Sequence, residues 1–424
     1  MVNNLSPKQR RVLLYIFLVA FLLRIIFIFS FHNFDDMERM KKVGEEMIEI
    51  ATNIVKGNGF SAKFIFDEDT KPTAIMAPIY PYSLSLLLRF FGMNGYLIIQ
   101  LIQATVSSLI CVILYLTGLR VFNNERVALI ASFLSIFYLP LIYYCTVIWS
   151  GIFFVFLVTL YIYNLLKSES EPGWYRIILS GLILGIALIT DPVMVSFIPL
   201  SSIWLLLNFK TEFKTSLKKV ILMVGLSLLI VLPWTIRNYM VFDRFVFIKS
   251  HLGFNFWLGN NPYATGTEKL KNKDSTDYKL PDEEYDYLMN LNESERDRLF
   301  LSKALTFIKE NPEKFIRLFL KKFKSFWWII ENKKAGFTDD NKVKAMKITY
   351  GIPFLLALLG MLLSYNRIKY CSLIWFFLLS LSFVYSLTIV AVYRYRLPVE
   401  PYLLLFAAVT ISKIADRFLI RNKV

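Results

Sequence analysis

Residues that bind metal ions through nitrogen or sulfur are scarce in this sequence. Its 424 residues include two histidines, His32 and His251, which lie far apart, so no histidine-based metal cluster is expected. The three cysteines, Cys111, Cys145 and Cys371, are odd in number and lie in or beside apolar segments. They are typical of small core residues, not of a disulfide framework or a metal site. We therefore expect no metal and no cofactor.

Charged residues are scarce as well. They make up 19% of the sequence, against roughly 25% in soluble domains. Hydrophobic residues make up 56%, and the mean hydropathy is +0.51. Apolar runs long enough to cross the hydrocarbon core of a bilayer as helices recur along the chain. The composition therefore predicts an all-α polytopic protein of the cell membrane.

The net charge is nevertheless +16, which would suit a nucleic-acid partner. The placement of the basic residues argues against one, because lysine and arginine lie mainly in loops and at the ends of apolar runs. Contact with lipid headgroups and the preference for basic residues in cytoplasmic loops both produce that distribution. We therefore expect membrane lipids as partners and no nucleic acid.

The basic loops also predict an orientation. Residues 8–11, residues 210–219 and the tail after residue 415 are rich in lysine or arginine and are expected in the cytoplasm. Ten apolar spans connect them: residues 11–31, 96–119, 127–144, 147–166, 175–190, 193–208, 218–239, 347–364, 370–391 and 398–415. The first is expected to be a retained signal anchor, since no small-residue cleavage site follows it. Both termini are then predicted to be cytoplasmic.

Residues 78–91 form a further apolar segment. If it crossed the membrane, the number of crossings would be eleven, and the two termini would lie on opposite sides. The segment is short and carries Arg89 near its end, so we interpret it as a re-entrant or interfacial helix. Two polar regions then face the outside. The resulting division is an N-terminal transmembrane module (1–239) that includes the first outer loop (32–77), an extracytoplasmic loop region (240–346) and a C-terminal transmembrane module (347–424).

The first outer loop contains an amphipathic pattern. Apolar residues recur at spacings of three and four within residues 39–56, which predicts a helix lying along the membrane. Glu46 is expected in the middle of this helix, on a polar stripe that includes Asn53. A solvated helix face explains the stripe, and so does a general base that deprotonates an acceptor hydroxyl just above the bilayer. Asp35 and Asp36, directly after the first span, are alternative bases.

Three arginines fall on the outer side of the predicted topology: Arg237, Arg394 and Arg396. The preference for basic residues in cytoplasmic loops disfavours this side. One interpretation is that each arginine only extends its side chain to the headgroups. The other is an anionic partner, because the guanidinium fork suits bidentate binding of phosphate.

A second amphipathic pattern lies in the larger outer region. Lys314, Arg317, Lys321 and Lys324 recur at helical spacing and share their helix with aromatic residues. Trp327 and Trp328 follow, and tryptophans are typical of the membrane interface. We interpret the segment as a juxtamembrane helix that binds lipid headgroups, with help in seating a lipid-phosphate substrate as the alternative.

Several short motifs follow one another from one end of the chain to the other. They are Gly44-x-Glu46-Met47-x-x-Ile50-Ala51 with Gly57-x-Gly59-Phe60, Pro72-Thr73-Ala74 with Ala77-Pro78-x-Tyr80-Pro81, Pro233-Trp234-x-x-Arg237-Asn238-Tyr239, Gly259-Asn260-x-Pro262, and Arg394-Tyr395-Arg396-Leu397-Pro398. Each motif is loose alone. The ordered set resembles the large integral-membrane glycosyltransferases of the C-type fold, in particular the bacterial branch related to protein mannosyltransferases (glycosyltransferase family 39) and lipid A aminoarabinose transferases.

The resemblance implies an all-α C-type glycosyltransferase fold with ten or eleven transmembrane helices, amphipathic juxtamembrane helices in the first outer loop and a larger second outer loop. It also implies that a sugar is transferred from a polyprenyl-phosphate donor to a lipid, glycan or protein acceptor at the extracytoplasmic face. An acid of the first outer loop would act on the acceptor, and Arg237, Arg394 and Arg396 would hold the donor phosphate.

The resemblance further implies substrate contacts for Asn53, Tyr80, Asn238 and Asn260. Many relatives begin the first outer loop with an acidic pair followed by a tyrosine. This chain has Asp35-Asp36 without a nearby tyrosine, and the acid that aligns with the Ala-x-Asn run is Glu46. Glu46 is therefore the first choice as the base, and the acidic pair is the second.

Two other classes of function stay open. A transporter or flippase would place ionisable groups near the membrane midplane, whereas the predicted spans are nearly free of charge away from their ends. A non-catalytic scaffold would use the outer loops to bind a partner. The glycosyltransferase is preferred because the polar motifs gather at one surface of the membrane.

Overall fold

The computed structural model describes residues 6–30, 44–63, 67, 69–169, 173–209, 212–266, 287–328, 340–388 and 393–421. Helices dominate these residues. The β structure among them is one short antiparallel pair in the first outer loop, β1 (Ser61–Ala62) and β2 (Lys71–Pro72), with Ser61 opposite Pro72.

The helices follow the apolar runs of the sequence. They are α1 (Pro7–Ser30), α3 (Glu45–Val55), α4 (Ile79–Phe91), η1 (Gly92–Asn94), α5 (Gly95–Phe122), α6 (Glu125–Ile136), α7 (Leu139–Tyr143), α8 (Gly151–Ser168), α9 (Trp174–Leu188), η2 (Pro192–Phe197), α10 (Ile198–Asn208), α11 (Phe213–Phe242), α12 (Leu252–Gly259), α14 (Glu293–Glu310), α15 (Pro312–Trp327), α16 (Asp340–Leu363), η3 (Tyr365–Arg367), α17 (Ile368–Thr388), η4 (Tyr393–Arg396) and α18 (Glu400–Arg421).

Each of the ten predicted spans coincides with helical structure, but two are interrupted. The span predicted at 127–144 consists of α6 and α7, because Pro140 cannot continue a helix from the preceding turn and instead lies in the first turn of α7. The span predicted at 193–208 begins with the 3-10 turn η2 after Pro192 and continues as α10. Proline positions therefore set where these spans break.

The structure has five helical segments in its described residues that are long and apolar enough to cross a membrane. They are α1, the continuous stretch Ile79–Phe122, α8, α11 and the segment Tyr365–Thr388. Shorter apolar helices occur at Trp174–Leu188, Pro192–Asn208 and Ile348–Leu363. The chain is a multi-pass membrane protein. The number of crossings, the side on which each terminus lies and the interfacial position of α4 stay predictions.

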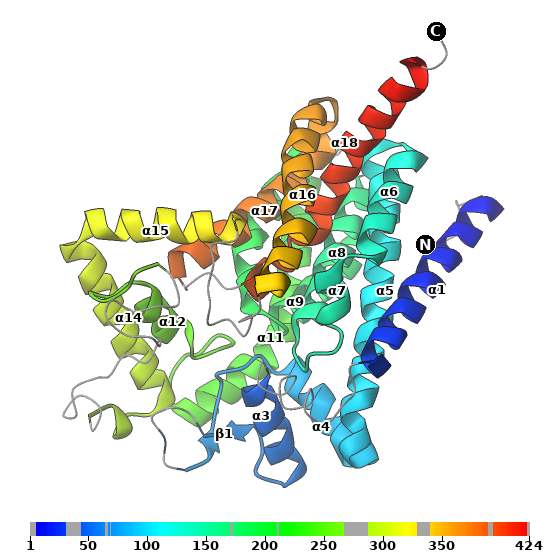
Figure 1. Cartoon of the computed structure of the whole chain (residues 1–424). Coiled ribbons are helices and arrows are strands. Elements are labelled where there is room, and N and C mark those ends of the chain that lie inside the picture. Colours follow the sequence, from blue (N-terminus) through cyan, green and yellow to red (C-terminus); the bar gives the residue numbers. More distant parts are fainter. Residues whose placement is uncertain are drawn as a thin grey trace.

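The first outer loop lies at one end of the helix bundle, where α3, β1 and α4 gather beside α12 and α14 (Figure 1). The predicted amphipathic helix is present as α3, with Met47 and Ile50 buried. Two details of the prediction are wrong. The helix begins at Glu45 after Gly44, so Glu46 lies in its first turn and not in its middle. Asn53 is 8% exposed and belongs to the buried face, not to the polar stripe.

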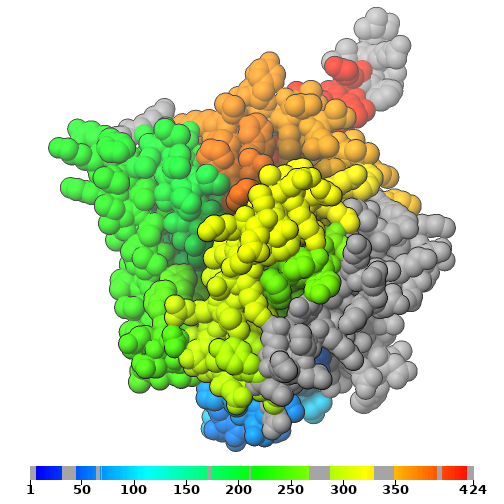
Figure 2. Space-filling view, turned by 90° about the vertical axis from the view of Figure 1, so that its left-hand side faces the viewer, coloured from blue at the N-terminus to red at the C-terminus, as the bar shows by residue number. Residues whose placement is uncertain are grey.

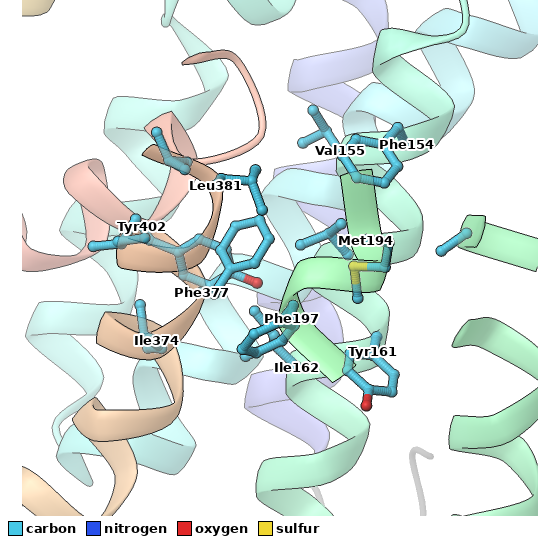
Figure 3. Packing of buried hydrophobic residues seen from close by; sticks show 14 of the residues in the cluster. Phe154, Val155, Tyr161, Ile162, Met194, Phe197, Ile374, Phe377, Leu381 and Tyr402 are labelled. Atoms are coloured by element: carbon cyan, nitrogen blue, oxygen red, sulfur yellow. The ribbon is translucent and has the colours of Figure 1, made fainter. Parts of the chain in front are cut away.

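The core of the bundle contains a row of contacting aromatic side chains from several helices. Figure 3 shows Phe197 of η2 between Tyr161 of α8 and Phe377 of α17. The ring centroids of Phe197 and Phe377 are 5.2 Å apart, and those of Phe377 and Tyr402 of α18 are 5.7 Å apart. Close van der Waals contact of this kind, not transfer from water, stabilises helix association in lipid. It also fixes η2, whose first residue follows Asp191.

The buried Arg24 of α1 joins three helices. Its Nε donates to Oγ of Ser107 on α5 at 2.8 Å, and its guanidinium nitrogens lie 3.5 Å and 3.4 Å from the carbonyl oxygens of Ser135 and Ile136. Those carbonyls belong to the last turn of α6, where no further turn of the helix follows to donate N–H groups to them. Arg24 therefore satisfies the end of a helix that stops inside the bundle.

α15 runs across the direction of α16 and α18 (Figure 1) and forms part of the molecular surface together with α14 (Figure 2). Lys321 and Lys324 are exposed beside the apolar Ile316 and Leu320, which are 56% and 60% exposed. Adjacent apolar and basic strips are typical of a helix in the plane of a membrane interface. The predicted amphipathic helix is thus present, and its headgroup contact stays a prediction.

Candidate active site

Glu46 occupies the start of α3, where the first outer loop meets the bundle. A Cβ atom at Gly44 would lie 1.7 Å from the carbonyl oxygen of Ile148, so only glycine allows this close approach to the loop after α7. The Glu46 side chain is exposed. Acidic residues are favoured in a helix's first turn by the helix dipole, and both Glu45 and Glu46 lie there.

Charged residues from three distant parts of the sequence are linked electrostatically to Glu46, two of them directly and Asp191 through Lys249. Lys249, in the segment between α11 and α12, interacts electrostatically with Glu46, Asp191 and Arg394. Arg394 of η4 also interacts with Glu46. We call these four residues the charged cluster. Glu46 is exposed, and Asp191, Lys249 and Arg394 are partly buried.

In the charged cluster, burial and the neighbouring charges shift the pKa values in opposite directions. Burial lowers the pKa of Lys249, and the carboxylates of Asp191 and Glu46 oppose that shift. Burial raises the pKa of Asp191, against the effects of Lys249 and of the hydrogen bond from the Val193 N–H. For Arg394, burial favours a lower pKa, but interactions with Tyr395, Tyr144 and Glu46 raise it. Arg394 is therefore a permanent cation.

Of the three predicted phosphate-binding arginines, Arg394 interacts electrostatically with Glu46. The Nε atom of Arg394 is buried and makes no hydrogen bond within the part of the chain that the structure describes. Its Nη2 atom lies 3.4 Å from the hydroxyl of Tyr395, and its guanidinium carbon lies 5.3 Å from the centroid of that ring. Arg394 thus retains hydrogen-bonding capacity for a ligand.

Arg396, two residues away, bonds to other residues of the protein. It is 3% exposed, and its Nε donates to Glu400 at 2.8 Å. Its Nη1 donates to the carbonyl oxygen of Phe326 at 3.2 Å, and its guanidinium carbon lies 3.4 Å from the centroid of the Tyr350 ring. These contacts fix η4 between the end of α15 and the start of α18.

Arg237 also makes protein contacts. Its Nη1 donates to the carbonyl oxygen of Thr73 at 2.7 Å and its Nη2 to that of Phe60 at 3.0 Å. The guanidinium carbon lies 5.5 Å and 4.8 Å from the ring centroids of Phe60 and Trp234. Arg237 therefore binds the first outer loop to α11, and phosphate binding by Arg237 and Arg396 stays a prediction.

The four predicted substrate-binding residues are buried and bond to the protein. Asn53 Nδ2 donates to the carbonyl oxygen of Ser61 at 2.9 Å. Asn238 Nδ2 lies 3.2 Å from the carbonyl oxygens of Val246 and Ile248, and Asn260 Nδ2 lies 2.9 Å from those of Phe256 and Leu387. The hydroxyl of Tyr80 donates to Gln103 Oε1 at 2.8 Å. Their contacts hold segments together, and contact with a substrate stays a prediction.

The remaining candidates, Asp35 and Asp36, lie outside the described residues. No group of three or more histidine, cysteine, aspartate or glutamate side chains that could hold a metal ion occurs within the described ranges.

Comparison with known proteins places this geometry in a wider context. Residues 71–236 match a family model described as dolichyl-phosphate-mannose-protein mannosyltransferase. No curated protein matches the chain. Among solved structures, the oligosaccharyltransferase of Archaeoglobus fulgidus tethered to an acceptor peptide aligns with a TM-score of 0.58 at 15% identity, over 98% of this chain and 50% of that one.

A second structure of that protein, AglB with an inhibitory peptide and dolichol-phosphate, aligns with a TM-score of 0.59 at 13% identity, over 99% of this chain and 52% of that one. Its apo form aligns with a TM-score of 0.59 at 14% identity, over 98% of this chain and 51% of that one. The chain has the C-type glycosyltransferase fold. It spans about half the length of the solved relative that it matches.

Within this C-type fold, acids that the sequence analysis did not single out anchor the first outer loop. Glu293 of α14 accepts hydrogen bonds from the Thr73 hydroxyl at 2.5 Å, from the Ala74 N–H at 2.8 Å and from the Ser250 hydroxyl. Burial raises the pKa of Glu293, and these hydrogen bonds oppose the shift. The tripeptide Asn292-Glu293-Ser294 gave no signal that could have revealed this role.

A buried ion pair adds a second anchor. Arg296 Nη2 lies 3.0 Å and 2.9 Å from the two carboxylate oxygens of Asp67, and Lys71 Nζ lies 3.0 Å from the same group. Removing one partner of such a buried pair leaves an uncompensated charge and costs more than the loss of an exposed pair. The first outer loop, which carries Glu46, is thus fixed to both α11 and α14.

Proposed function

We propose that the chain is a membrane glycosyltransferase that moves a sugar from a polyprenyl-phosphate donor to an acceptor hydroxyl at the extracytoplasmic face of the cell membrane. The observation that carries the proposal is the charged cluster, in which an exposed carboxylate of the first outer loop interacts electrostatically with Arg394, whose Nε makes no hydrogen bond within the described residues. The family match and the fold support a lipid-linked donor.

In the proposed reaction, Glu46 accepts the proton of the acceptor hydroxyl as its oxygen attacks the anomeric carbon. The bond between that carbon and the phosphate oxygen breaks, and the phosphate leaves with the electron pair. Arg394 stabilises the developing charge through its guanidinium. Arg237 and Arg396 act by holding the first outer loop and η4 in place.

The test requires the lipid-linked sugar donor, which is obtained from cells. Cells that lack the protein are expected to accumulate its unused lipid-linked sugar, which mass spectrometry of polyprenyl-phosphate lipids identifies. With that donor, Glu46→Gln in purified protein is expected to lower the transfer rate by about 100-fold or more, the usual contribution of a general base. Its thermal stability should equal that of the wild type, because the side chain is exposed.

Glu45→Gln is the matched control, since Glu45 is exposed in the same helical turn and should keep nearly full activity. Full activity of Glu46→Gln would remove Glu46 from the mechanism, and Asp35→Asn and Asp36→Asn would then be tested as the alternative bases. Translocation of lipid or solute in proteoliposomes without any glycosylated product would favour the transporter, which the comparisons do not support.

A further inference from the structure

A row of polar side chains lies on the buried face of α5. Gln100, Gln103 and Ser107 recur at spacings of three and four residues and are at most 2% exposed. Gln100 Nε2 donates to the carbonyl oxygen of Thr146 at 2.6 Å, and Ser107 Oγ donates to that of Leu141 at 3.1 Å. Polar groups inside an apolar bundle are costly unless they are hydrogen-bonded. The row therefore binds the chain in and after α7.

Gln103 makes three hydrogen bonds through its side-chain amide. Its Nε2 donates to the carbonyl oxygens of Cys145 at 2.8 Å and Val147 at 2.9 Å, and its Oε1 accepts from the Tyr80 hydroxyl at 2.8 Å. Both donor hydrogens and the acceptor oxygen of the amide are thus used. The two carbonyls belong to the segment between α7 and α8, which we call the α7–α8 turn (residues 144–150). One amide joins this turn to α4.

The α7–α8 turn and α4 both pack against α3. Ile148 of the turn and Tyr80 of α4 share a buried apolar cluster with Met47 and Ala51 of α3. Directly before α3 the contact is backbone to backbone, because a Cβ atom at Gly44 would lie 1.7 Å from the carbonyl oxygen of Ile148. Since Gly44 has no side chain that could give way, a shift of the turn is transmitted to the start of α3.

A purely structural role explains part of this arrangement. Irregular backbone inside an apolar bundle must have its carbonyl groups satisfied, which accounts for two of the hydrogen bonds of Gln103. The third bond, from Tyr80, adds α4 to the same amide. Glu46 lies in the first turn of α3, two residues after Gly44. Because a misplacement of about 1 Å can cost on the order of 100-fold in rate, the support of this turn bears on catalysis.

We propose that Gln103 is a positioning residue for the transfer reaction. Its amide fixes α4 and the α7–α8 turn against the start of α3 and thereby holds Glu46 in its productive position. This inference rests on the proposed function. In this role Gln103 touches neither the donor nor the acceptor, and it affects the rate only through Glu46. Its removal should therefore slow transfer only in a protein that has Glu46.

The experiment is a double-mutant cycle in the purified full-length protein. Membranes of cells that lack the protein supply the accumulated lipid-linked sugar and the unused acceptor, and mass spectrometry follows the consumption of the lipid-linked sugar. Gln103→Met is similar in size but forms none of the three hydrogen bonds, and it is expected to lower the rate by about tenfold or more. In the Glu46→Gln background the same substitution should cause no further loss, because the displaced side chain no longer acts as a base.

Asn164→Leu is the matched control for the loss of a buried amide. Asn164 of α8 is fully buried, and its Nδ2 donates to the carbonyl oxygen of Arg176 at 2.8 Å and to Ser180 Oγ at 2.7 Å, both on α9. Asn164→Leu and Gln103→Met should both lower the midpoint of thermal unfolding, but Asn164→Leu should consume the donor at the wild-type rate. An equal loss of rate in Asn164→Leu would attribute the effect of Gln103→Met to general destabilisation and overturn the proposal.

The outcomes separate this inference from the proposed function. If Glu46→Gln loses activity while Gln103→Met keeps the wild-type rate, or lowers the rate by the same factor with and without Glu46, positioning by Gln103 is overturned and the proposed function stands. If Glu46→Gln consumes the donor at the wild-type rate, Glu46 is removed from the proposed function and the inference falls with it.

A second variant decides if Gln103→Met does not fold. The buried carboxyl group of Gln103→Glu stays protonated, so it keeps the acceptor for Tyr80 and one donor for the α7–α8 turn. It should lower the rate, though less than tenfold, and again only when Glu46 is present. An equal loss in the Glu46 and Glu46→Gln backgrounds contradicts the proposal.

Discussion

At the scale of single residues, Lys322 of α15 is an unusual lysine. Its side chain is fully buried, and its Nζ lies 3.1 Å from Asn260 Oδ1 and 3.3 Å from the carbonyl oxygens of Gly259 and Leu387. These three acceptors are neutral oxygens. Burial without an acid lowers the pKa of Lys322 to about 7. The Gly259-Asn260 motif thus serves to receive this ammonium group.

The lowered pKa predicts how stability depends on pH. Between pH 7 and about 10 the unfolded chain holds a proton on Lys322 that the folded chain has lost. The folded state therefore gains stability as the pH rises through this window, by up to about 4 kcal/mol. Lys322→Met should remove this gain, seen as a smaller increase in the midpoint of thermal unfolding between pH 6.5 and 9.5.

Lys321→Met is the control for this measurement, because Lys321 is the exposed neighbour on the same helix. It should show the same pH dependence as the wild type. Equal pH dependence in Lys322→Met and the wild type would contradict a perturbed lysine at this site.

At the same scale, the sequence does not predict how neighbouring residues differ in their contacts. Arg394 and Arg396 are two positions apart in one motif and were predicted to act alike. The structure separates them because Glu400, the first residue of α18, pairs with Arg396 and not with Arg394. Lys249 lies outside every motif, and its electrostatic interaction with Glu46 and Arg394 arises only when the chain folds. No local pattern carries that information.

At the scale of helices, apolar runs predicted the long apolar helices, whereas the polar helix α14 was not predicted and the interruptions of the spans depend on tertiary partners. α6 stops inside the bundle at Ile136 because Pro140 follows and because Arg24 of α1 satisfies its last carbonyl groups. A buried arginine in a membrane helix is costly unless it is bonded in this way.

Replacing Arg24 is therefore expected to destabilise the bundle. Arg24→Leu removes a donor from the carbonyl oxygens of Ser135 and Ile136. Ser135 still accepts from the Tyr138 N–H, so the cost of about 1–3 kcal/mol for a buried group left unsatisfied applies to Ile136. The expected result is a lower midpoint of thermal unfolding in detergent, with Arg11→Leu, an exposed position of the same helix, as the control. An unchanged midpoint for Arg24→Leu would show that the α6 end is stabilised by other contacts.

At the scale of the whole molecule, the candidate site is assembled from segments hundreds of positions apart. Glu46, Asp191, Lys249 and Arg394 come from four different parts of the chain. Their meeting requires the first outer loop to be fixed to α11 by Arg237 and to α14 by Glu293. The sequence predicted a candidate site on this loop, but not these anchors, because nothing near Arg237 or Glu293 in the sequence indicates which distant groups they bond.

The predicted orientation can be tested on the intact protein. The three native cysteines are buried, so a membrane-impermeant thiol reagent should label an introduced cysteine with little background. Ser302→Cys, at an exposed position of α14, should react in intact cells. Lys214→Cys, exposed at the start of α11, should react only after the membrane is permeabilised. The reverse pattern would invert the topology and move the proposed site to the cytoplasm.

The contact between Arg396 and the carbonyl oxygen of Phe326 joins η4 to the last turn of α15. α15 exposes apolar and basic side chains next to each other. If it lies in the membrane interface as predicted, its depth depends on the thickness and charge of the bilayer. A displacement of α15 would then act on Arg396, and Arg394 lies two residues before it in η4. The lipid composition of the membrane would thereby influence the geometry of the site.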